Sequence, residues 1–166
     1  MTVPQRLQMR CYLGLVLCML GASLPSAQAM SDGSFPGKGS KAVWNKASEI
    51  VKVGIQLGQA GKDREAIGLY QKAIGMYPFD SLFYYNTGIA YSDLKDYRKA
   101  EAFYRKAISL EPTYYSAWYN MGIDFYWQGN YRQSQTAIEK AQALAKTEKQ
   151  KSDAAAYLKA LKSKLK

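Results

Sequence analysis

Small and apolar residues recur along this chain with a period of 34 residues. Glycine stands at Gly54, Gly88 and Gly122. Each glycine has a large apolar or aromatic residue four positions before it and another three positions after it: Ile50 and Leu57, Tyr84 and Tyr91, Trp118 and Phe125. Three copies at one fixed period indicate a repeat architecture, in which neighbouring units stack to bury a continuous core.

Within each copy the apolar positions follow one another at spacings of one, three and four, which is the pattern of an amphipathic helix. Glycine or proline interrupts the pattern at Gly61, Pro78 and Pro112, and these residues end helices. The spacing predicts six helices of about 13 residues each, over residues 41–60, 63–77, 81–94, 97–110, 115–128 and 131–144. Asp63, Asp96 and Asn130 are suitable N-caps for the second helix of each pair.

The second helix of each pair carries its own periodic small and large residues. Small residues recur at Ala66, Ala100 and Ser134 and at Ala73, Ala107 and Ala141, and large ones at Tyr70, Tyr104 and Ile138. Small residues fixed in phase let two helices approach closely, and the large residues fill the space left beside them. With the turn prolines, these positions resemble the tetratricopeptide repeat (TPR) family, with repeats at 47–80, 81–114 and 115–148.

The resemblance implies an all-α fold, a TPR superhelical solenoid of three helix-turn-helix repeats in a domain spanning 41–166. Lys146 stands where a third turn proline would fall. After it, an apolar stripe runs along residues 149–165, and terminal repeats of a solenoid need a cap with a polar outer face. We therefore expect a seventh, capping helix, with Leu158, Leu161 and Leu165 packed on the third hairpin.

The first 29 residues differ in composition from the repeats. Arg6 and Arg10 precede a 14-residue apolar run, and Ala27-Gln28-Ala29 places small residues before Met30. This pattern predicts a signal peptide over 1–29. The alternative is an uncleaved membrane anchor, although the run is shorter than the roughly 20 residues that span a bilayer. Residues 30–40 are rich in Gly, Pro and Ser and are expected to form a flexible linker.

Composition limits the chemistry that the chain can perform. The sequence has no His, and both cysteines, Cys11 and Cys18, lie in the predicted signal peptide. The mature chain would therefore lack a disulfide, the usual zinc ligands and a His- or Cys-based nucleophile–base pair. We expect no metal, no cofactor and no enzymatic activity.

In TPR proteins the first helices of the repeats line a concave groove, and the resemblance assigns this groove here. The implied partner-binding residues are apolar, aromatic or amide: Val51, Ile55, Tyr85, Asn86, Ile89, Tyr119, Asn120, Ile123 and Tyr126. Such a surface suits an extended peptide or an amphipathic helix of a partner protein. The alternative is that the tyrosines pack between repeats and that Asn120 bonds the neighbouring backbone.

One TPR subtype binds the C-terminal carboxylate of chaperone tails through basic and amide residues. The corresponding positions here are Val51, Ile55, Asn86, Ser116 and Asn120. Only Asn86 matches that subtype, so we do not expect a carboxylate clamp.

Positive charge gathers at the end of the chain. Residues 146–166 hold seven lysines and two acidic residues. Loss of the two signal-peptide arginines would lower the net charge from +10 to +8. The lysines either attract an acidic partner or an anionic membrane surface or form the solvated face of the capping helix. Nucleic-acid binding is not expected, because no arginine cluster or ribonucleoprotein motif occurs.

These patterns together predict a non-catalytic protein-interaction module or scaffold. A bacterial-looking signal favours export, with the periplasm first and a thylakoid lumen as the alternative. A second hypothesis is self-assembly or association with a membrane surface through the lysine-rich C-terminal helix. In that hypothesis Phe79, Tyr114, Tyr115 and Trp127 are candidate exposed aromatic residues.

Overall fold

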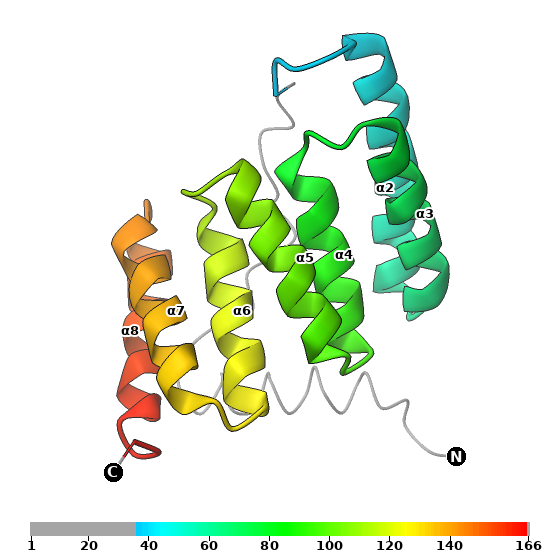
Figure 1. Ribbon diagram of the computed structural model, residues 1–166. Helices are drawn as coiled ribbons and strands as arrows, with labels where there is room; N and C mark the ends of the chain where they lie inside the picture. The colour runs from blue at the N-terminus through cyan, green and yellow to red at the C-terminus, as the bar shows by residue number, and fades with distance from the viewer. Residues whose placement is uncertain (1–35, 166) are drawn as a thin grey trace, which may run out of the picture.

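The computed structural model describes residues 36–165. This part of the chain is all-α and contains seven helices in antiparallel pairs (Figure 1). They are α2 (Lys41–Gln59), α3 (Asp63–Met76), α4 (Ser81–Asp93), α5 (Tyr97–Leu110), α6 (Tyr115–Trp127), α7 (Tyr131–Leu144) and α8 (Glu148–Leu161). The predicted signal peptide and residues 30–35 of the predicted linker lie outside the described residues.

The helices form three hairpins, α2–α3, α4–α5 and α6–α7, followed by α8. In Figure 1 the hairpins stand side by side, and α2, α4, α6 and α8 all run from the top of the view to the bottom. The turns that join one hairpin to the next therefore lie at the top, and the turns within the hairpins lie at the bottom. The predicted pairs of helices are confirmed.

The helix boundaries agree with the prediction to within a few residues. α5 and α7 have the predicted limits, and Asp96 caps α5 by accepting a hydrogen bond from the Lys99 backbone N–H at 3.2 Å. Asp63 is instead the first residue of α3, whose N-cap is Lys62; assignments commonly differ by one residue at helix ends. Asn130 stands at the N-cap of α7 without a side-chain capping bond.

The periodic glycines lie where two helices of one hairpin approach most closely. A Cβ atom on Gly54 would lie 2.5 Å from the Tyr70 ring, and one on Gly88 would lie 2.5 Å from the Tyr104 ring. On Gly122 it would lie 2.7 Å from the Ile138 side chain. All three distances are shorter than real Cβ contacts, so any other residue at these positions would force a neighbouring side chain to shift.

The within-hairpin turns also repeat every 34 residues. Gly61, Lys95 and Gly129 occupy equivalent places and have φ angles of 92°, 62° and 78°. Glycine adopts this left-handed conformation freely, whereas a residue with a Cβ atom is strained in it. Lys95 therefore carries backbone strain that the other two turns avoid.

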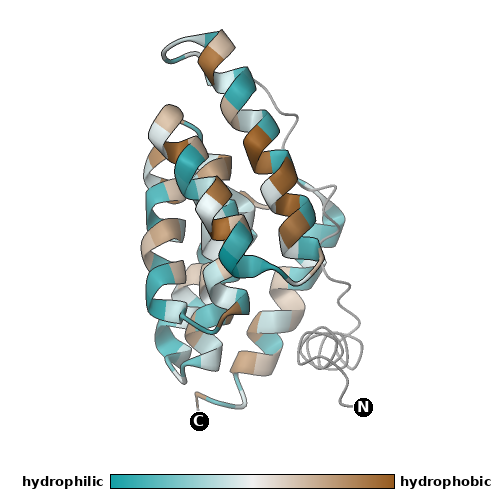
Figure 2. Ribbon diagram, turned by 90° about the vertical axis from the view of Figure 1, so that its right-hand side faces the viewer, coloured by the Kyte–Doolittle hydropathy of each residue, from teal (hydrophilic) through white to brown (hydrophobic). Residues whose placement is uncertain are grey.

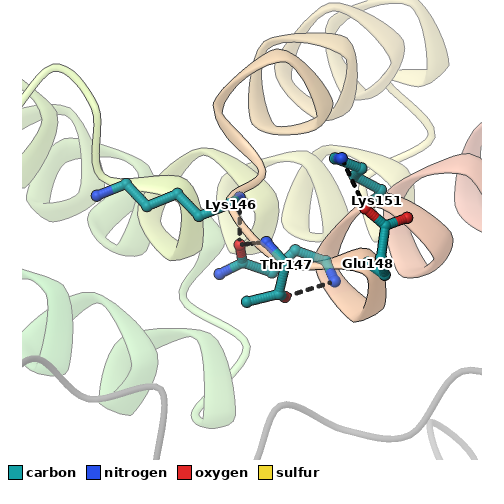
Figure 3. A network of polar contacts seen from close by, with 5 residues as sticks. Lys146, Thr147, Glu148 and Lys151 are labelled. Carbon is teal, nitrogen blue, oxygen red and sulfur yellow. Dashed lines mark hydrogen bonds and ion pairs between the residues drawn. The ribbon is translucent and has the colours of Figure 1, made fainter.

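Helix α8 packs on the third hairpin and closes that end of the array. It begins with a capping box, in which the Gln150 backbone N–H donates to Thr147 Oγ1 at 3.1 Å and the Gln150 side chain accepts from the Thr147 N–H (Figure 3). Ala154 and Leu161 are buried, and Leu158 packs beside them. Leu165 is 37% exposed, beyond the end of the helix, so its predicted packing on the hairpin is wrong.

At the opposite end of the array no further helix covers α2 and α3 within the described residues, and their exposed face is mostly polar. Figure 2 views the molecule from the α2–α3 side, where apolar positions recur along the length of α2. Val43 and Val53 are exposed on this helix. Among residues 36–165, no helix is both long and apolar enough to cross a membrane.

Candidate functional site

The nine residues predicted to bind a partner divide into two groups by exposure. Ile55, Ile89, Asn120, Ile123 and Tyr126 are partly exposed. The side chains of Val51, Tyr85, Asn86 and Tyr119 are buried. The nine residues therefore do not form one continuous exposed surface.

Tyr85 packs between the second and third hairpins. Its ring lies 4.9 Å from that of Tyr114 and 6.1 Å from that of Tyr104, measured between centroids. Its hydroxyl accepts a hydrogen bond from Asn120 Nδ2 at 2.9 Å, so Asn120 bonds a side chain of the neighbouring repeat and not the backbone that the alternative named. Burial raises the pKa of Tyr85 to about 12. Tyr85 therefore packs between repeats, which was the alternative to partner binding.

Tyr119 is covered by the capping helix. Its ring stacks on Tyr115 at 5.5 Å and meets the edge of Tyr157 of α8 at 6.1 Å. Tyr126 contacts the same Tyr157 at 5.7 Å but stays partly exposed. Position along α6 alone did not reveal that α8 would cover part of the predicted stripe.

A pocket of about 1030 Å³ lies beside α2, along Trp44 to Ile55. It is formed by α2, by the two turns that link successive hairpins, and by the start of α8. Two of the predicted residues, Val51 and Ile55, line it. Its wall is mixed: polar and charged residues alternate with aromatic and aliphatic ones, which include Trp44, Phe79, Leu82, Phe83, Leu110, Tyr114 and Tyr115.

Two carboxylates line the pocket at the turns between hairpins. Asp80 is buried and is the N-cap of α4, where it accepts hydrogen bonds from Trp44 Nε1 at 2.7 Å and from the Leu82 N–H at 2.9 Å. Burial raises the pKa of Asp80, and the like charge of Glu111 adds to the effect. Ser81 Oγ donates to Glu111 Oε2 at 2.7 Å, which ties the second turn to the start of α4.

Two hydroxyls that border the pocket have no hydrogen-bond partner within residues 36–165. They belong to Ser48 and Tyr114. Tyr114 is only 9% exposed, so the expectation of an exposed Tyr114 is wrong. Tyr115 is partly buried and donates to the Gln150 carbonyl at 3.0 Å. Phe79 and Trp127 are exposed, as expected.

The Ser48 and Tyr114 hydroxyls are unpaired buried donors, which are costly, and a bound acceptor would relieve that cost.

Sequence reasoning missed most of this pocket. Trp44, Asp80 and Tyr114 come from three separate segments, and no single helical stripe connects them. One signal was available: aromatic residues stand one or two positions after the turn prolines, as at Phe79 and Tyr114. Phe79 is exposed, whereas Tyr114 also packs in the core against Tyr85.

A second buried carboxylate lies between α4 and α6. Asp124 is 3% exposed, and its Oδ1 accepts a hydrogen bond from Ser92 Oγ at 2.6 Å. Its Oδ2 has no partner among the described residues. Burial raises the pKa of Asp124 to about 7, with a further contribution from Asp93. In the described part of the chain, no three His, Cys, Asp or Glu side chains gather as metal ligands would.

Comparison with known proteins identifies the repeat. Residues 81–114 match the family described as Tetratricopeptide repeat. A comparison with curated proteins found no match.

Solved structures share the whole architecture. The first TPR of Spaghetti (RPAP3), bound to the HSP90 peptide SRMEEVD, is 23% identical over 73% of this chain and 94% of that one, with a TM-score of 0.67. The Yersinia enterocolitica type III secretion chaperone SycD, in complex with a peptide of the translocator YopD, is 16% identical over 74% and 96%, with a TM-score of 0.69. The chain therefore contains a tetratricopeptide repeat and has the fold of a TPR superhelix.

Proposed function

We propose that this chain is a non-catalytic interaction module that binds a peptide segment of a partner protein. The pocket beside α2 carries this proposal. It has the volume of a ligand site, and its wall combines apolar and aromatic side chains with polar and charged ones that a peptide can pair with. The partly exposed residues Ile89, Asn120, Ile123 and Tyr126 would extend the contact surface beyond it.

The similar structures support a peptide as the ligand class. Two proteins of the same fold are described with bound peptides, one from HSP90 and one from a secretion translocator. Their identities to this chain are low, so they support the class of partner and not its sequence. Val51, Ile55 and Ser116, at the positions of a carboxylate clamp, all line the pocket here and none is basic.

The test is selection of binders from a phage-displayed library of random 12-residue peptides, followed by fluorescence anisotropy with the peptides obtained. Phe79→Glu places a charge in the pocket wall and should abolish binding of the selected peptides. Leu94→Glu is the matched control, because Leu94 is 40% exposed against 42% for Phe79 but lies in the α4–α5 turn, away from the pocket. Equal loss of affinity in both folded variants would contradict the proposed site.

We also propose that the protein acts outside the cytosol, in the cell envelope of a bacterium or in a thylakoid lumen. The basic flank, short apolar run and Ala27-Gln28-Ala29 support it. Expression of the full chain in a bacterial host with periplasmic fractionation and N-terminal sequencing tests this point. A mature chain that begins at Met30 is expected, and a full-length chain in the membrane fraction would favour the uncleaved anchor.

A second candidate function is association with an anionic membrane surface. Trp127 is 43% exposed at the end of α6, and the bottom of Figure 1 shows the C-terminal end of α8 at the same end of the molecule. Within residues 36–165, Lys159, Lys162 and Lys164 form no ion pair. Flotation with vesicles containing anionic lipid at low salt tests this candidate, and an absence of binding would remove it.

A further inference from the structure

We propose that the pocket beside α2 selects a peptide with a lysine or arginine side chain, which Asp80 and Glu111 would bind. This inference rests on the proposed function and specifies the chemistry of its ligand. The two carboxylates come from successive turns between hairpins, and both line the same pocket. The Ser81 side chain, which directly follows Asp80, holds the Glu111 carboxylate at 2.7 Å.

Neither carboxylate has a cationic partner within the described residues. Asp80 is bonded by two neutral donors, Trp44 and Leu82. Glu111 is bonded by the neutral Ser81 hydroxyl. The structural role of Asp80 as the α4 cap accounts for its burial, but it does not account for the second carboxylate held beside it. Asp80 is buried and Glu111 is exposed, and two like charges lining one pocket favour a bound cation.

The two lysines of the lining do not neutralise this pair. Lys52 Nζ bonds the Glu49 carboxylate at 2.7 Å. Lys146 is exposed and forms no ion pair in residues 36–165. The lining therefore has three carboxylates and two ammonium groups, and the buried charged group among them is Asp80. Charge complementarity favours a basic ligand over an acidic one.

The remaining walls fit the other parts of such a ligand. Lysine and arginine have long aliphatic stems that pack on apolar surface while the charged head stays polar. Trp44, Phe79 and Phe83 supply aromatic surface for the stem, and an aromatic face also attracts the cation. Tyr114 lines the same pocket, and its hydroxyl oxygen, which is shielded from solvent, has no hydrogen-bond partner among the described residues.

The experiment compares peptides selected by the wild type with those selected by Asp80→Asn/Glu111→Gln at low salt. Asparagine caps helices as well as aspartate does, so the double variant removes both charges and keeps the α4 cap. The wild type should select peptides with Lys or Arg at one shared position. Replacing that residue by norleucine should weaken binding by about tenfold, as expected for one charged contact. Glu111→Gln should remove much of that difference, whereas Glu139→Gln, on the exposed side of α7, should leave it unchanged.

The outcomes separate this inference from the proposed function. Peptides that bind in the pocket without a shared basic residue would overturn the inference and leave peptide binding intact. The same conclusion would follow if Glu111→Gln did not change the preference for the basic residue over norleucine. Both proposals are overturned if the wild type selects no peptide, or if every peptide that it selects binds equally well to the Phe79→Glu variant. Thermal unfolding of each variant establishes that the comparison is made between folded proteins.

Discussion

Gly88 shows how a single hydrogen atom sets the distance between two helices. An added Cβ atom would lie 2.5 Å from the buried Tyr104 ring, which is held by the surrounding core. Overpacking of this kind costs about 1–3 kcal/mol, so Gly88→Ala should lower the free energy of unfolding by that amount. Gly68→Ala in α3 is the control: nothing lies within 4 Å of its Cβ position, and helix propensity predicts a gain of up to about 1 kcal/mol. Urea unfolding of both variants checks the opposite signs.

Lys95 is the residue that the repeat pattern would replace with glycine. Its φ of 62° lies where Gly61 and Gly129 stand in the other hairpins. Lys95→Gly should raise the free energy of unfolding by about 1 kcal/mol, because glycine adopts the left-handed conformation without strain. Gly129→Ala should lower it by a similar amount. Thermal unfolding at matched pH measures both variants, and a loss of stability in Lys95→Gly would show that the side chain contributes more than the strain costs.

Asp124 makes the stability depend on pH in an unusual direction. Its pKa is about 7 in the folded protein and about 3.9 in an unfolded chain, so the folded state holds a proton that the unfolded state has released. The contribution of this group is therefore greatest below about pH 4 and is lost as pH rises through 7. We expect a loss of roughly 2–4 kcal/mol across this range.

Asp124→Asn should abolish this loss, because it keeps the polar contact with Ser92 without an ionisable group. Urea unfolding at pH 5, 6, 7 and 8 compares the two proteins. As pH rises, the free energy of unfolding of the variant should increase relative to that of the wild type, and the variant should be the more stable protein at pH 8. Parallel pH profiles would assign the dependence to other groups.

Two residues show which features the sequence could predict at this scale. The role of Gly88 was predictable because glycine recurs every 34 residues, at the point where the two helices of a hairpin approach too closely to accommodate a Cβ atom without a shift. The burial of Tyr85 was not, because it depends on Tyr114 and Asn120 from the next hairpin, which meet its ring and hydroxyl from the side. Helical periodicity predicts which face of its helix a side chain occupies, but it does not predict which residues of the next hairpin contact that side chain.

Helix α8 is the element on which the end of the array depends. Leu161 is fully buried, whereas Leu165, four residues later, is exposed beyond the helix. Leu161→Ala should cost about 2–5 kcal/mol, as for other buried leucines, and Leu165→Ala should change the stability by less than about 0.5 kcal/mol. Thermal unfolding of the two variants tests the assignment. A similar effect of both substitutions would mean that the last residues pack as firmly as the helix does.

The helices themselves were predictable because their ends are marked locally. Asp96 caps α5, and Gly129 occupies the turn before α7 with the positive φ that its position requires. The pocket was not predictable in this way. Its residues come from α2, from two turns and from α8, so their assembly depends on how the hairpins stack and is not recorded in any one segment.

At the scale of the whole molecule, each hairpin touches only its neighbours. α3 packs on α4, α5 packs on α6, and α7 packs on α8. Stability in such an array is a sum of unit and interface contributions, so the second and third hairpins, each with a packed neighbour on both sides, should open least often. Hydrogen exchange should be slower in α4, α5, α6 and α7 than in α2 and α8. Slowest exchange in α2 would contradict the nearest-neighbour description.

The two ends of this array are chemically different, and the difference gives the molecule a direction of growth. At one end α8 covers the third hairpin and presents exposed lysines, which include Lys149, Lys151 and Lys159. At the other end no helix covers α2 within the described residues, and Val43 and Val53 are exposed there among polar residues. A designer who wished to lengthen the protein would therefore graft a further hairpin ahead of α2 and replace the exposed polar residues that it would cover. The same graft after α7 would first require removal of α8.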